Sequence, residues 1–273
     1  MRCAWEKLTA ILPRELSRQL DARDRESVQE IRLRVNVPPE VNLGRTQRQL
    51  SGTVSLENLT YVLNLASQYS PWCADSLAQG YLTAPGGHRI GVCGEGIFRR
   101  GKIEGFRQVR SLCIRVARDF PGIGAGIEET STLIVGSPGW GKTTLLRDLA
   151  RQFSSRETVS VVDERGELFP EGFETGQHMD ILTGVPKPQG VEMVLKTMGP
   201  AYIAVDEITS EADSLVMLQA ANCGVHLLAT VHGSGLSDLR QRPMYRRLLE
   251  AGVFRQILVL NRDQSYQRER MTV

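Results

Sequence analysis

A glycine-rich segment between an apolar run and a helical stretch is the strongest constraint on what this chain can fold into. It reads Gly136-Ser-Pro-Gly-Trp-Gly-Lys142-Thr143-Thr144 and follows the apolar residues 132–135. Glycines let the backbone turn tightly enough for successive N–H groups to face one anion, and the start of the following helix adds the positive end of its dipole. The spacing G-x-x-x-x-G-K-T therefore predicts a strand, a phosphate-binding loop and a helix.

This loop predicts nucleotide binding, with ATP and Mg²⁺ as the expected cofactors. Lys142 is long enough to reach the β- and γ-phosphate oxygens, and the Thr143 hydroxyl is suited to ligate the magnesium ion. The predicted nucleotide-binding residues are Gly136, Ser137, Pro138, Gly139, Trp140, Gly141, Lys142, Thr143 and Thr144.

Two acidic residues directly follow the apolar run 201–205. A nucleotide-hydrolysing loop needs a carboxylate at the end of a neighbouring buried strand, and Asp206 is predicted to hold the magnesium shell there. Glu207 is predicted to polarise the attacking water as a general base. These roles depend on the phosphate-binding loop, because a strand followed by acidic residues is common by itself.

Two further strand ends carry polar groups. Asp163 and Glu164 follow the apolar run 158–162, so they are expected at the same carboxyl edge of the sheet, where both are expected to touch the nucleotide or its water. A solvated loop, or an ion pair with Arg165, is the alternative for them. His232 ends the run 224–233 and is predicted to contact the γ-phosphate, with a structural histidine as the alternative; His226, at the start of that strand, is the weaker candidate.

The rest of the chain predicts two domains. From residue 132 onward, apolar strands alternate with helical stretches, which indicates βαβ units and an α/β fold with a parallel-rich sheet. The first 120 residues mix helical spacing, as in 5–20 and 56–67, with short strands and expected hairpins between 81 and 116, so a smaller α+β domain is expected. The segment 120–126 holds one Pro and three Gly, which favours a linker. The predicted parts are 1–120, a linker at 121–127, and 128–273.

Composition excludes several classes of protein. The 273 residues carry a formal charge of +2, so nucleic acid or an anionic membrane would need a local basic patch. The arginines between 240 and 255 have only two aromatic neighbours, fewer than a nucleic-acid platform usually shows. No apolar stretch is long enough to span a bilayer, and the N-terminus lacks a signal-peptide pattern, so a cytoplasmic protein is expected. The five cysteines form no C-x-x-C pair, which predicts no zinc site.

The four motifs, in this order behind an α+β domain, resemble the type II/type IV secretion ATPase superfamily. The resemblance implies a RecA-like P-loop ATPase domain, with Walker A at Gly136–Thr144, an Asp box at Asp163–Glu164, Walker B at Asp206–Glu207 and a His box at 226–232. It also implies a homo-oligomeric ring, expected to be a hexamer, in which N-terminal arginines contact a neighbour's nucleotide. Arg89, Arg110 and Arg115 are the candidates, and a solvated basic face is the alternative for each.

More narrowly, several segments of the first domain resemble the sporulation members of that superfamily in endospore-forming bacteria. These segments are 30–34, 79–83, 85–91 and 119–124. The resemblance implies a mother-cell cytoplasmic ATPase that powers or gates the channel between mother cell and forespore, with the membrane proteins of that channel as partners. The chain lacks the four-cysteine zinc module of larger secretion ATPases, so their cargo mechanics are not transferred.

Three hypotheses follow. The first is a Mg²⁺-dependent ATPase motor in which the linker lets the two domains move as ATP is bound and hydrolysed. The second is an assembly scaffold that ATP binding orders, with little turnover. The third, which the sequence favours least, is a nucleic-acid motor on the same core.

Overall fold

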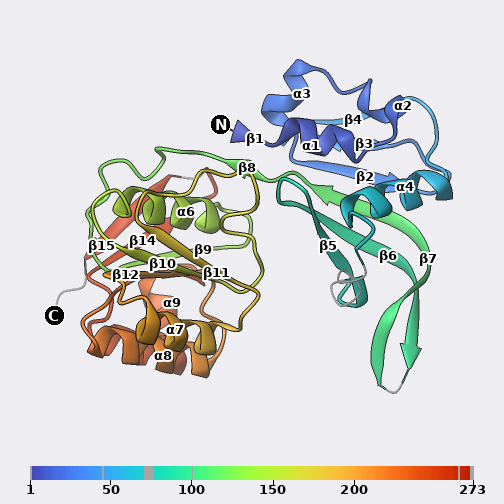
Figure 1. Cartoon of the computed structure of the whole chain (residues 1–273). Helices are drawn as coiled ribbons and strands as arrows, with labels where there is room; N and C mark the ends of the chain where they lie inside the picture. Colours follow the sequence, from blue (N-terminus) through green and yellow to red (C-terminus); the bar gives the residue numbers. More distant parts are fainter. Residues whose placement is uncertain (1, 45, 71–76, 100, 264, 271–273) are drawn as a thin grey trace. The chain divides into compact units, whose positions relative to one another are not determined.

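The computed structural model describes residues 2–44, 46–70, 77–99, 101–263 and 265–270. The chain divides into two compact units (Figure 1). The first comprises Met1–Asp119 together with Pro170–Phe173, and the second comprises Phe120–Phe169 and Glu174–Val273. The predicted linker, 121–127, is thus grouped with the second unit, and its role as a hinge stays a prediction.

The first unit is an α+β domain around a six-stranded antiparallel sheet of order β4-β3-β2-β7-β6-β5. A separate two-stranded sheet pairs β1 with β8. The described helices are α1 (Trp5–Ala10), α2 (Arg14–Ser17), α3 (Ala22–Ser27) and α4 (Leu56–Ala66). The strands are β1 (Arg2–Cys3), β2 (Glu30–Arg34), β3 (Glu40–Asn42), β4 (Gln47–Gln49), β5 (Tyr81–Ala84), β6 (His88–Arg99), β7 (Lys102–Arg115) and β8 (Arg118–Asp119).

Helix formation in this unit follows the sequence where the caps are clear. Ser55 begins α4 with a capping box, in which its hydroxyl accepts the Asn58 N–H and the Asn58 side chain accepts the Ser55 N–H. The helical spacing over 5–20, however, does not give one helix. Pro13 has no N–H to donate, so α1 ends at Ala10 and α2 begins after the proline.

One core holds the first unit together. Leu8, Ile31, Leu59 and Ile90 are among its fully buried side chains, and they come from α1, β2, α4 and β6. His88 is also fully buried: its Nε2 contacts the Ala4 carbonyl at 3.1 Å and its Nδ1 accepts the Ala117 N–H at 3.2 Å. Burial lowers the pKa of His88, so the ring is neutral at physiological pH.

The second unit is built on a seven-stranded sheet of order β11-β10-β12-β13-β9-β14-β15, in which only the β14–β15 pair is antiparallel. This confirms the predicted parallel-rich α/β sheet behind a smaller α+β domain. The strands are β9 (Thr132–Gly136), β10 (Val159–Asp163), β11 (Met179–Thr183), β12 (Tyr202–Val205), β13 (His226–His232), β14 (Gln256–Leu260) and β15 (Tyr266–Arg270). The helices are α6 (Lys142–Phe153), α7 (Lys187–Thr197), α8 (Glu211–Asn222), α9 (Leu236–Gln241) and α10 (Pro243–Glu250).

Alternate residues of the central strands supply the two cores of this unit. Ile134 of β9 packs with the apolar side of α6, whereas its neighbours Leu133 and Val135 pack with α7, α8 and α10. Figure 1 shows α6 on one face of the sheet and α7 and α8 on the other. Burial on both faces explains the continuous apolar runs of these strands.

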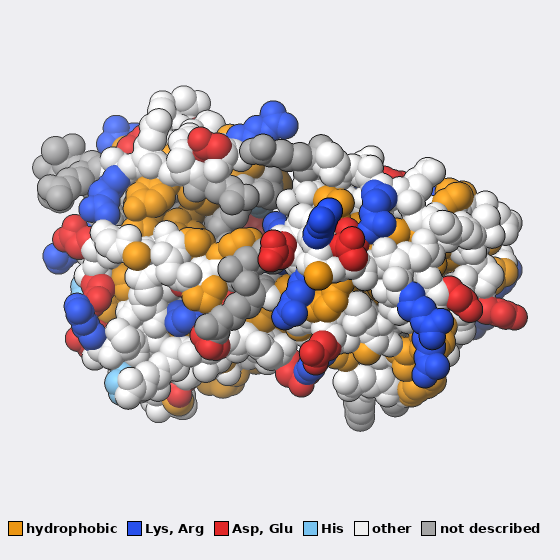
Figure 2. Space-filling model, turned by 90° about the horizontal axis from the view of Figure 1, so that it is seen from above, with side chains coloured by type: hydrophobic (Ala, Val, Ile, Leu, Met, Phe, Trp, Pro, Cys, Tyr) orange, Lys and Arg blue, Asp and Glu red, His pale blue; other side chains and the backbone are white. Residues whose placement is uncertain are grey.

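Two features of the structure concern nucleic acid and membranes as partners: the distribution of surface charge and the length of the helices. On the face shown in Figure 2, Lys and Arg side chains are interspersed with Asp and Glu rather than gathered into one basic tract. Within the described part of the chain, no helix is long and apolar enough to cross a membrane. The four described cysteines are free, and Cys73 lies outside the described residues.

Candidate nucleotide-binding site

The glycine-rich loop has the backbone that the motif predicts. It leaves β9 at Gly136 and enters α6 at Lys142. Gly139 and Gly141 adopt φ angles of +78° and +94°, in the left-handed region that side chains disfavour, and nothing lies within 4 Å of where their Cβ atoms would be. The loop therefore offers an open concave backbone at the N-terminus of a 12-residue helix, which fits a phosphate group.

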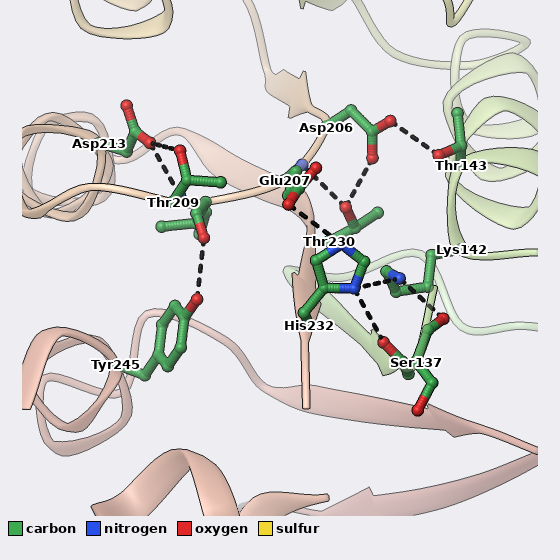
Figure 3. A network of polar contacts seen from close by, with 12 residues as sticks. Ser137, Lys142, Thr143, Asp206, Glu207, Thr209, Asp213, Thr230, His232 and Tyr245 are labelled. Carbon is green, nitrogen blue, oxygen red and sulfur yellow. Dashed lines mark hydrogen bonds and ion pairs between the residues drawn. The ribbon is translucent and has the colours of Figure 1, made fainter. Parts of the chain in front are cut away.

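Lys142 lies folded over this loop and begins a chain of polar contacts. Its Nζ donates to the Ser137 carbonyl at 3.1 Å and contacts Nδ1 of His232 at 2.9 Å (Figure 3). Nε2 of His232 lies 3.0 Å from a carboxylate oxygen of Glu207. Nδ1 also lies 3.4 Å from the Gly136 carbonyl, so the His232 ring links the loop and the Lys142 ammonium to the Glu207 carboxylate.

Burial changes the pKa of Lys142. The residue is 6% exposed, and desolvation lowers the pKa of its ammonium, with the carboxylates of Asp206 and Glu207 acting in the opposite direction. A desolvated cation beside an open loop is an attractive partner for an anion, because phosphate oxygens would replace the lost hydration.

Asp206 is held by two hydroxyl groups. Thr143 Oγ1 donates to its Oδ2 at 2.7 Å, and Thr230 Oγ1 donates to its Oδ1 at 2.6 Å. Mg²⁺ prefers oxygen ligands and tolerates few protein groups in its shell. The neighbouring Thr143 hydroxyl and Asp206 carboxylate therefore fit a magnesium ion, and these two residues would hold it.

Glu207 occupies a strained backbone position that its neighbours enforce. Its φ of +56° is unusual for a residue with a side chain and costs about 1–3 kcal/mol. Its N–H donates to Thr230 Oγ1 at 2.8 Å, and the next N–H, of Ile208, donates to the Thr230 carbonyl at 2.9 Å. Tyr245 donates its hydroxyl to the Ile208 carbonyl at 3.0 Å, so the turn is tied down on both sides.

The Asp box residues divide into two roles. Asp163 is 3% exposed, and its carboxylate accepts backbone N–H groups from Glu167 and Leu168 at 3.0 and 2.8 Å. It therefore shapes the loop after β10. Glu164 faces a pocket that Thr143, Asp206 and Glu207 also line, and its Oε2 lies 2.8 Å from Nζ of Lys187. The partner of Glu164 is thus Lys187 rather than the expected alternative, Arg165.

Strand order explains why distant sequence motifs meet. β13, which ends at His232, lies between β12, which precedes Asp206, and β9, which precedes the loop. All three strands are parallel, so their carboxyl ends share one edge of the sheet. The structure brings Lys142 next to His232, and Thr143 next to Asp206, as the motifs predict. Their chemical roles stay predictions.

Other candidates lie elsewhere. His226 is at the opposite end of β13, where Nδ1 contacts Ser131 Oγ at 3.1 Å and the ring packs on Tyr202. Arg89 and Arg115 are directly opposed on β6 and β7 of the first unit.

Arg110, the third candidate arginine, lies at a register shift of the β6–β7 pairing, and Arg110 Nη2 donates to Gln108 Oε1 at 3.2 Å. Action of any of the three on a neighbouring subunit stays a prediction.

The contacts of two residues of the site were not predicted from the sequence. Thr230 was expected only as one of the polar groups near the end of its strand, and its spacing of two residues from His232 places both side chains on one face of β13. Lys187 follows Pro186 at the start of α7, 23 residues after Glu164, and nothing in the spacing indicates their contact.

The chain is similar to known proteins along most of its length. The sequence model of the family "Sporulation stage III, protein AA" matches residues 4–270. Stage III sporulation protein AA of Bacillus subtilis (strain 168) is 35% identical over 255 residues, which cover 86% of this chain and 83% of that protein.

Among solved structures, the ATPase DotB of Legionella pneumophila superposes with a TM-score of 0.60 at 18% identity, covering 93% of this chain and 79% of that one. The pilus retraction motor PilT, solved with bound ADP, superposes with a TM-score of 0.59 at 13% identity, covering 85% and 74% of the two chains.

The sheet order and the loop define a protein with a RecA-like P-loop fold, the fold shared with the ATPase DotB and the pilus retraction motor PilT. Within that class, the chain belongs to the sporulation stage III protein AA family.

Proposed function

We propose that this protein is a Mg²⁺-dependent ATPase that works as a homo-oligomer. One observation carries the proposal: the chain of contacts from Lys142 through His232 to Glu207 lies beside the Thr143–Asp206 pair. A phosphate-directed cation, a magnesium-type oxygen pair and a carboxylate are the parts that phosphoryl transfer to water requires.

Each residue has a distinct task in this proposal. Thr143 and Asp206 would hold Mg²⁺, which would supply neutralisation of the charge that develops on the phosphates. Lys142 binds the phosphate oxygens, and Glu207 accepts the proton of the attacking water. His232 links these two groups, so that movement of Lys142 toward a phosphate is felt at Glu207.

The test is steady-state ATP hydrolysis against protein concentration for the wild type, Lys142→Ala and Glu207→Gln. Turnover that is lost in both variants and rises more than linearly with concentration supports an assembling ATPase. Glu192→Gln is the matched control, because Glu192 lies on the surface of α7 and pairs only with Lys196 among the ion pairs of the described residues. Full activity in Glu207→Gln would refute the assigned base.

Membership of the family supports a place in sporulation. We propose that the protein acts in the mother-cell cytoplasm, as a ring expected to be a hexamer, and powers or gates the channel to the forespore with that channel's membrane proteins. In this proposal the two units move relative to each other during the ATP cycle. Co-purification with those membrane proteins, dependent on Lys142, tests the partnership.

The scaffold hypothesis remains the second candidate. The strained Glu207 argues against it, because a turn held at φ +56° costs stability that a protein without turnover gains nothing from. ATP-dependent assembly with sporulation that survives Glu207→Gln would favour the scaffold.

A nucleic-acid motor has less support. Arg242 pairs with Asp238 at 2.8 Å and Arg247 with Glu211 at 3.2 Å, so charges of that cluster are partly neutralised within the chain. Stimulation of turnover by DNA would revive that hypothesis.

A further inference from the structure

Lys187 is a buried cation in the wall of the nucleotide site. It is the first residue of α7, is 8% exposed, and directs its Nζ to Glu164 Oε2 at 2.8 Å. The same pocket is lined by Thr143 and by both acidic residues that follow β12. None of the predicted catalytic steps uses this lysine.

The position is energetically unfavourable for a lysine. The N-terminus of a helix carries the positive end of the dipole, and α7, with 11 residues, is long enough for the effect. Burial adds the cost of removing the ammonium from water. An apolar side chain such as methionine would avoid both costs, so packing does not explain Lys187.

The exposed lysine on the same helix shows the contrast. Lys196 lies 3.6 Å from Glu192, with side chains 72% and 49% exposed, where water screens the interaction. In the Glu164–Lys187 ion pair the lysine side chain is 10% exposed and the glutamate 40%. Such a half-buried pair holds its carboxylate in one place far better than a solvated pair does.

Glu164 needs an anchor because of its surroundings. It follows β10 on an exposed loop and shares the pocket with Asp206 and Glu207, whose negative charges repel it. A free glutamate would turn to solvent. The Lys187 ammonium supplies the attraction that keeps the carboxylate in the pocket.

We propose that Lys187 is a positioning residue, which holds the Glu164 carboxylate at the mouth of the nucleotide site, where it orients the attacking water. This inference rests on the proposed ATPase function. Lys187 touches neither nucleotide nor water in this scheme; it acts through Glu164 alone.

The kinetic test is a double-mutant cycle with Lys187→Met, Glu164→Gln and the double variant. We expect each single variant to lower kcat about tenfold and leave KM for ATP within about twofold, and the double variant to lose no more than either single one. Lys187→Arg should restore most of the activity. Lys196→Met, on the same helix, is the matched control and should match the wild type.

Two kinetic results would overturn the proposal. Losses that multiply in the double variant would mean that Lys187 acts independently of Glu164. A rise in KM with kcat unchanged in Lys187→Met would mean that the lysine binds the phosphates directly.

A urea-unfolding cycle tests the ion pair without any turnover. Glu164→Gln should lower the unfolding midpoint, because it leaves a buried cation without its carboxylate, and adding Lys187→Met should restore it. Additive shifts would refute the pairing. If the wild type binds ATP but does not hydrolyse it, the proposed function fails while this cycle still decides whether Lys187 holds Glu164.

Discussion

Replacing Thr230 with valine is the sharpest test of how the site is held together. The side chain is fully buried and makes two hydrogen bonds: it donates to Asp206 and accepts the Glu207 N–H. Valine has the same shape, so no cavity forms, and the change removes only the hydroxyl. Loss of a hydrogen bond to a carboxylate costs about 1.5–3 kcal/mol, and an unsatisfied buried N–H costs about 1–3 kcal/mol.

The expected loss for Thr230→Val is therefore about 3 kcal/mol in the free energy of unfolding. At roughly 2–4 °C per kcal/mol for a chain of this size, the melting temperature should fall by about 10 °C. Thermal melts and urea unfolding followed by circular dichroism measure it. Thr230→Ser keeps the hydroxyl and loses one methyl group, so it should cost only about 1 kcal/mol.

The same substitution should affect turnover more than nucleotide affinity. Without Thr230, the strained turn at Glu207 loses a tether, so kcat should fall about 10–100-fold, whereas KM for ATP should change little because Lys142 and the loop remain in place. A valine variant with wild-type stability would refute the hydrogen-bonding argument. A variant that is destabilised but keeps full kcat would show that Glu207 needs no such positioning.

Three further predictions concern other buried polar groups. Burial lowers the pKa of Lys142, so the unfolded chain holds that proton more tightly and the buried charge costs stability at neutral pH. Lys142→Met should therefore raise the melting temperature measured without nucleotide, and it should abolish the rise expected when ATP binds to the wild type. A lower melting temperature for Lys142→Met without nucleotide would contradict this. Burial also lowers the pKa of His88, so the stability that the neutral ring contributes is present above the unfolded pKa near 6.5 and is lost as the pH falls below it. The free energy of unfolding of His88→Gln should therefore fall less between pH 7 and pH 5.5 than that of the wild type. His178→Gln is the control, because His178 is exposed. Asp148 is 1% exposed and accepts the N–H groups of Gly122 and Gly124 at 2.9 and 2.8 Å. Asp148→Ala should therefore lower the free energy of unfolding by about 2–4 kcal/mol and make the segment 120–126 accessible to limited proteolysis. Unchanged cleavage in that segment would show that these hydrogen bonds do not hold it.

The candidate nucleotide site can be predicted from the sequence where a residue type has a single physical use. The loop from Gly136 to Thr144 needs its glycines and its lysine in a fixed order, and Asp206 follows a strand that must be buried. The hydrogen bonds of Thr230 to Asp206 and Glu207 could not be predicted, because a threonine in an apolar run is also an ordinary β-branched strand residue. Lys187 meets Glu164 only through the packing of α7 beside β10, which no local pattern encodes.

The fold showed the same division. Strands buried on both faces, such as β9 and β12, stand out as apolar runs, whereas β11 is an edge strand of half-exposed residues and gave no such signal. The hairpin strand β15 is missed for a similar reason: its residues Tyr266–Arg270 are largely charged or polar. A buried strand records its environment in its sequence, and an exposed one does not.

The segment 120–126 is attached to α6, and this attachment limits how far the segment can move by itself. Gly124 packs so closely that an added Cβ would lie 2.7 Å from Leu149 Cδ2, so this glycine serves close packing rather than looseness. Asp148 lies six residues after Lys142 on α6, so the two residues are about 9 Å apart along the helix axis. If α6 tilts when a phosphate binds at its N-terminus, the segment 122–124 should move with it, because the Asp148 carboxylate ties the Gly122 and Gly124 N–H groups to that helix.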